Sequence, residues 1–159
     1  LDGKILPPTL ENLHCNNNAL KEIANLPAGL LELFCWSNKL VKLDHLPPTL
    51  IKLRCCNNEL EQLDNLPPGL RTLYCLWNRL RRLDFLPIGL RTLACYQNPL
   101  EELRHLPPYL EEVDMPPYLL GLTYYQSLQK MDEYTTWRLV ELPDSIIEIN
   151  GKTDLKPPY

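Results

Sequence analysis

Apolar residues return along this chain at a constant interval of 20 residues. The interval starts from Leu-Pro dipeptides, which stand at residues 6–7, 26–27, 46–47, 66–67, 86–87 and 106–107. Each unit then reads L-P-x-x-L-x-x-L-x-C-x-x-N-x-L. A unit this short cannot enclose its own apolar side chains, so neighbouring units must stack and share one continuous core.

The pattern within a unit predicts one short strand followed by an extended return leg. Leu13-His14-Cys15 alternates apolar and polar residues, which is typical of a strand with Leu and Cys turned inward. Strands from stacked units should run parallel. The return leg carries the pairs Pro7-Pro8 and Pro47-Pro48, and proline favours an extended, polyproline-like backbone.

The repeated unit resembles the leucine-rich repeat signature L-x-x-L-x-L-x-x-N-x-L, with Cys in the third apolar position. Its 20-residue length and its L-P-x-x-L segment resemble the short bacterial type of YopM-like, IpaH-like and Legionella-type effectors. The resemblance implies an α/β solenoid, a right-handed superhelix with a concave parallel β-sheet and an extended convex side.

Three segments follow from where the pattern begins and ends. Residues 1–5 would be a short N-terminal cap or a truncated start. Residues 6–123 would form the array, with a degenerate sixth unit. Residues 124–159 would be a capping segment, with a helix over 124–141 and a final strand over 142–149, where L-P-x-x-L returns with Ile substituted.

Two columns of identical residues predict structural roles. The inward cysteines should be buried, reduced thiols that pack as small apolar groups, while Cys56 should face outward. The asparagine of each unit should satisfy backbone groups of adjacent loops. The members of these columns are Cys15, Cys35, Cys55, Cys75 and Cys95, and Asn18, Asn38, Asn58, Asn78 and Asn98.

The outward positions of the strands hold large aromatic and basic side chains that the fold does not require. Exposed patches of this composition mark protein interfaces, where Trp, Tyr and Arg dominate the binding energy. We expect a partner site centred on Tyr74 and Trp77, grading toward an acidic C-terminal end. Its predicted members are Phe34, Trp36, Arg54, Arg71, Tyr74, Leu76, Trp77, Arg91 and Tyr96.

Charge and composition exclude several classes of function. The 20 acidic residues outnumber the 16 basic ones, for a net charge of −4, so nucleic-acid binding is not expected. No apolar run suits a membrane span, so membrane insertion is not expected either. Cysteines 20 residues apart do not make a metal site. No serine or cysteine stands in a catalytic pattern, so we predict a non-enzyme without cofactor or metal, monomeric when free.

These observations favour a module that binds another protein. The resemblance implies secretion by a bacterium into the host cytoplasm, a reducing compartment, where the chain would bind and inhibit a host protein or another effector. The alternative is the substrate-recognition fragment of a ubiquitin ligase of the leucine-rich repeat type. Its catalytic domain would be absent here, because no cysteine follows Cys95.

Overall fold

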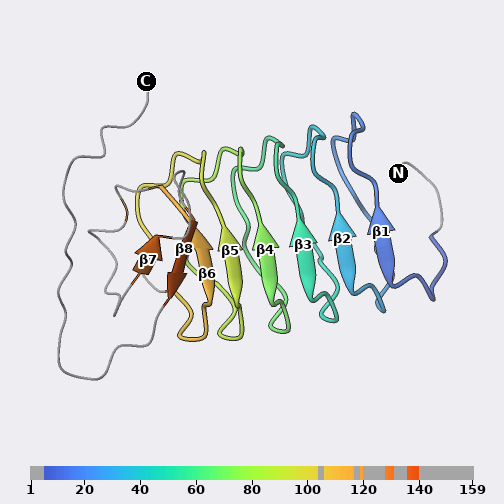
Figure 1. The fold of residues 1–159 in the computed structure, drawn as a ribbon. Coiled ribbons are helices and arrows are strands. Elements are labelled where there is room, and N and C mark those ends of the chain that lie inside the picture. Colours follow the sequence, from blue (N-terminus) through green and yellow to red (C-terminus); the bar gives the residue numbers. More distant parts are fainter. Residues whose placement is uncertain (1–5, 104–105, 117–118, 120–127, 131–135, 140–159) are drawn as a thin grey trace.

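The computed structural model describes residues 6–103, 106–116, 119, 128–130 and 136–139. Six short strands stand side by side and run parallel, in chain order (Figure 1). Each residue pairs with the residue 20 positions later, as Leu33 does with Leu53. The strands are β1 (Asn12–His14), β2 (Glu32–Phe34), β3 (Lys52–Arg54), β4 (Thr72–Tyr74), β5 (Thr92–Ala94) and β6 (Glu112–Asp114). The predicted solenoid with its parallel sheet is confirmed.

The core consists of the inward columns stacked from unit to unit. In the central units the leucines are fully buried, as Leu50, Leu53 and Leu60 show with exposed fractions of 0%. The central residue of every strand from β1 to β6 is buried, and the cysteine two positions later is buried in five of them. The sixth unit places Met115 in that cysteine position, also buried. The predicted alternation of inward and outward side chains is therefore confirmed.

The return legs contain turns and extended backbone in place of helices. In each leg a proline carbonyl accepts a hydrogen bond from the amide of the leucine three residues later, as Pro47 does from Leu50 at 3.0 Å. The first proline of the leg is buried and the residue after it is exposed in units such as Pro47-Pro48. The predicted extended convex side is confirmed.

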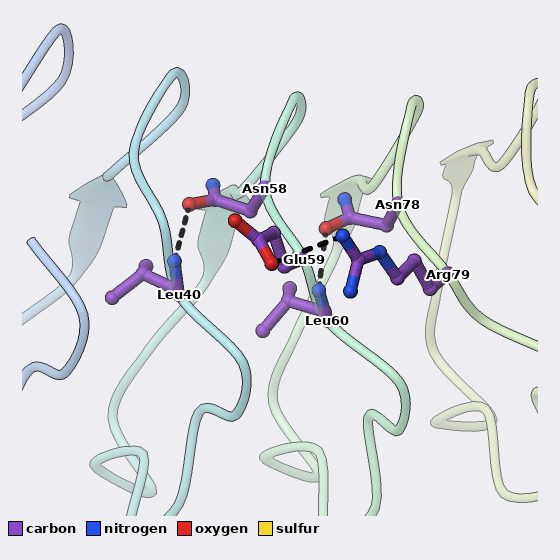
Figure 2. Close-up of polar contacts among 6 residues, drawn as sticks. All are labelled: Leu40, Asn58, Glu59, Leu60, Asn78 and Arg79. Carbon is purple, nitrogen blue, oxygen red and sulfur yellow. Dashed lines mark hydrogen bonds and ion pairs between the residues drawn. The ribbon is translucent and has the colours of Figure 1, made fainter. Parts of the chain in front are cut away.

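The asparagine column connects each unit to the one before it. Asn58 Oδ1 accepts a hydrogen bond from the Leu40 amide at 3.0 Å (Figure 2). Its Nδ2 donates to the carbonyls of Cys35 and Cys55, each at 3.1 Å. Asn38, Asn78 and Asn98 repeat this arrangement. Buried backbone groups must be paired, and in the irregular loops these amides pair them as predicted.

The helix predicted over 124–141 is wrong for the residues that the structure describes there. β7 (Leu128–Lys130) and β8 (Thr136–Leu139) are strands, and β8 pairs antiparallel with β6. The outer edge of β6 presents unpaired backbone groups, and a strand satisfies such an edge more fully than a helix does. The final strand predicted over 142–149 lies outside the described residues.

The inward thiols are held in their protonated form. Cys35, Cys55, Cys75 and Cys95 have exposed fractions of 0%, and all six cysteines of the chain are free. Burial raises the pKa of each of these four thiols, since a thiolate is poorly solvated in an apolar core. Cys56 is only partly buried.

Replacing Asn58 by Ala should destabilise the chain by about 2 kcal/mol. The Leu40 amide would lose its acceptor inside the core, whereas the Cys35 and Cys55 carbonyls would keep Asn38 and Asn78 as donors. Asn18→Ala is the matched control, because Asn18 is exposed and bonds only within its own unit, to Cys15 and Asn16. Urea unfolding measures both. Equal losses for the two variants would contradict the inter-unit role.

Alkylation by iodoacetamide at about pH 8 should label Cys56 first in the folded chain. The raised pKa and the burial of Cys35, Cys55, Cys75 and Cys95 leave almost no accessible thiolate, so these four should react only after denaturation. Peptide mass spectrometry identifies the labelled sites. The Cys56→Ser variant should lose the early label, and early labelling of Cys55 would contradict the buried column.

Candidate functional site

One outward column crosses the middle of the sheet. The register pairs His14 with Phe34, Phe34 with Arg54 and Arg54 with Tyr74. The column continues through Ala94 and Asp114 on β5 and β6. The 20-residue period therefore brings together four large side chains from four different strands.

These four side chains form a continuous stack. The rings of His14 and Phe34 lie 4.3 Å apart between centroids, tilted by 31°. The Arg54 guanidinium lies 5.1 Å from the centre of the Phe34 ring and 4.9 Å from that of Tyr74. An arginine over the face of an aromatic ring is attracted by the ring's negative quadrupole. Arg54 thus makes two such contacts, one with each neighbouring strand.

Arg54 is incompletely satisfied in the folded chain. Its Nε atom is buried, and no hydrogen-bond partner for it lies among the described residues. The guanidinium is charged at every physiological pH and carries five donors. A buried donor without an acceptor costs about 1–3 kcal/mol. The stack therefore positions a cation whose hydrogen bonds remain available.

A second outward column runs beside the first, one residue after the inward cysteines. It contains Trp36, Cys56, Leu76 and Tyr96, all partly buried. The backbone ladder continues past the strands here, because the Ser37 amide donates to the Cys56 carbonyl at 2.9 Å. This column extends the apolar surface of the concave face, the solvent-facing side of the sheet.

The thiol of Cys56 is less reactive than its outward position alone would imply. Burial raises its pKa most, while backbone hydrogen bonds, including one from Leu76, and the charge of Arg54 lower it in part. The net shift is upward, which disfavours the thiolate that a nucleophile needs. Cys56 is therefore part of the surface and not an activated thiol.

Trp77 occupies a strained position on the rim of the sheet. Its φ is 55° and half of its surface, 50%, is exposed. The same position in the other units holds residues with the same positive φ, namely Asn17, Ser37, Asn57 and Gln97. Asn tolerates this left-handed conformation, whereas a bulky residue in it is a true outlier that costs roughly 1–2 kcal/mol.

The structure does not bring Arg71 and Arg91 into the stack. Both precede their strands, and both are occupied by the following unit. Arg71 Nη1 donates to the Gly89 carbonyl at 2.8 Å, and a side chain at position 89 would collide with that guanidinium. Arg91 forms an ion pair with Glu111. These two predicted residues lie apart from the aromatic column and carry charges or donors already in use.

The remaining basic side chains of the fourth unit are also paired. Arg79 contacts Glu59 at 3.0 Å, a pair that Figure 2 shows on neighbouring loops. Arg81 contacts Glu101, and Arg82 contacts Glu102, each at 3.2 Å. The net positive charge counted along this unit is therefore compensated between units, and Arg54 stands as the cation of the central aromatic column.

Sequence reasoning missed two contributors to this surface. His14 was expected only as a surface side chain, yet its ring packs on Phe34. Lys52 was not considered, and its Nζ lies 5.2 Å from the centre of the same ring. Both follow from the register, because His14 stands 20 residues before Phe34 and Lys52 stands two residues before Arg54. The signal was present in the period.

Other kinds of site were sought across the described residues. Within them, no group of His, Cys, Asp and Glu is placed to hold a metal ion. No helix in that part of the chain has the length and apolar character to cross a membrane.

Comparison with known proteins places this architecture among bacterial repeat proteins. No protein-family model and no curated protein matches the chain. Solved structures do. YopM from Yersinia enterocolitica WA-314 is 40% identical over 70% of this chain, with a TM-score of 0.69. YopM from Yersinia pestis, described as a leucine-rich effector protein, is 37% identical over 67%, with a TM-score of 0.61.

A leucine-rich repeat domain of a Shigella effector is 34% identical over 66% of this chain, with a TM-score of 0.64. This chain spans only 25%, 30% and 48% of the length of the Yersinia enterocolitica, Yersinia pestis and Shigella proteins. The shared unit, the parallel sheet and the asparagine column identify the chain as a leucine-rich repeat protein of the short bacterial type, a protein-interaction module that resembles YopM and the Shigella effector domain.

Proposed function

We propose that the concave face binds a protein partner and that the chain acts as a bacterial effector in the host cytoplasm. Binding there would cover a surface of the partner and so inhibit it. The partner is a host protein or another effector. The proposed contact residues are the two outward columns and Trp77, with Arg71 and Arg91 at the edge where the strands begin.

The observation that carries this proposal is the conformation of Trp77. A large aromatic side chain stands half exposed at φ 55°, where the equivalent residues are small or polar. This arrangement lowers the stability of the folded chain, since Asn would fit the same backbone better. Strain of this kind is retained where it serves a function. Trp is also the residue type most enriched among interface hot spots.

The scaffold supports the same conclusion. The outward side chains stand on paired strands, so they lose little conformational freedom when a partner binds. Phe34, Tyr74, Leu76 and Tyr96 are partly buried by their neighbours and remain partly exposed. A rigid surface of this composition suits a protein partner better than a small ligand, which would need an enclosed pocket.

The free thiols support action in a reducing compartment. Six unpaired cysteines, five of them buried in one column, fit a protein that works where thiols stay reduced. The resemblance to effector proteins supports the host cytoplasm as that compartment.

The Trp77→Asn variant should lose the partner without losing stability. Asn relieves the strain at φ 55°, so the free energy of unfolding should equal or exceed that of the unchanged chain. Pull-down from host and bacterial lysates, read by mass spectrometry, should recover a protein with the unchanged chain. That protein should be depleted at least about tenfold with Trp77→Asn.

The matched control is Phe85→Asn. Phe85 is 79% exposed on a return leg, and the equivalent positions hold Asn25 and Asn65. This variant should retain the partner. Retention by Trp77→Asn together with loss by Phe85→Asn would move the site from the concave face to the return legs and overturn the proposal.

A further inference from the structure

Arg54 differs from the other arginines whose side chains the structure describes. Each of those donates to a carbonyl or carboxylate, in every case with a partner on a neighbouring unit. Arg54 instead lies over two rings, and its buried Nε has no hydrogen-bond partner in the described part of the chain. The paired arginines are Arg71, Arg79, Arg81, Arg82 and Arg91.

The surroundings of Arg54 are suited to an anion. Lys52 lies on the same strand and also contacts the Phe34 ring, at 5.2 Å. Its nearest carboxylate is that of Glu32, at 4.0 Å. Two cations therefore face one carboxylate around Phe34. The aromatic rings on either side of Arg54 limit its contact with water, which strengthens any charge-assisted hydrogen bond formed there.

The chemistry favours a carboxylate over a nucleic-acid phosphate. The planar guanidinium offers paired donors whose spacing matches the two oxygens of a carboxylate. Nucleic-acid binding would require several free cations along one path. The arginines of units four and five are already paired, so the concave face offers a single strong anion contact at Arg54 with Lys52 beside it.

We propose that Arg54 is the subsite for an Asp or Glu side chain of the protein partner, held between the rings of Phe34 and Tyr74. The proposal rests on the proposed function, because it specifies the chemistry of a partner on the same face. The partner should present an acidic side chain beside apolar residues, which would contact Leu76 and Trp77.

The probe is a library of linear peptides displayed on phage and selected on the full chain. Enriched peptides should share an Asp or Glu. Its replacement by Asn or Gln in a synthetic peptide should weaken binding at least about 30-fold. Against Arg54→Met, the same replacement should change the affinity less than about threefold. Such a double-mutant cycle isolates the coupling between the two groups.

The matched control is Arg82→Met, which removes an arginine paired with Asp84 and Glu102 on a return leg. It should leave the affinity and its dependence on the acidic residue unchanged. Circular dichroism should show that both variants are folded, since Arg54 lies outside the leucine core.

Two results would overturn the subsite. One is a library without enrichment of acidic peptides, including one that yields no binder. The other is a dependence on the acidic residue that persists in Arg54→Met. Neither result touches the proposed function, which fails only if the protein recovered in the pull-down is retained by Trp77→Asn. The two proposals therefore have separate readouts.

Discussion

The hydrogen bonds of the buried asparagines are the interaction on which the rest of the structure depends. Each unit has only three residues in regular strand, and the other backbone groups must be satisfied without a helix. Asn38, Asn58, Asn78 and Asn98 do this by accepting an amide and donating to two carbonyls of adjacent loops. They set the register between units, and that register determines which outward side chains become neighbours.

The same register separates the work of the two surfaces. On the return legs and strand starts it places arginines against the acidic residues of the next unit, so charge is neutralised within the scaffold. On the concave face it places Arg54 between two rings, where the charge stays uncompensated by any printed ion pair. Stability is thus concentrated in the core and the loops, while the sheet surface carries groups, such as Trp77, that the fold would not select.

Much of this architecture could be predicted from the period alone. The strands, the inward columns and the role of the asparagines all follow from apolar spacing and the need to pair buried amides. The end of the array could not be predicted in this way. The spacing of Leu128, Met131 and Tyr134 is compatible with a helix, but the exposed edge of β6 recruits β8 as a strand, which is a tertiary requirement. The pairing of Arg91 with Glu111 was readable as a 20-residue separation, yet counting charge unit by unit conceals it.

An exchange of whole units has a different consequence here from an exchange of single residues. Because every contact between units joins positions 20 apart, a gene rearrangement that removes residues 41–60 would leave the core columns and the asparagine bonds in register. It would, however, set Phe34 directly against Tyr74 and eliminate the cation between them. Recombination between repeats can therefore rewrite the recognition surface in one step while the scaffold is inherited unchanged.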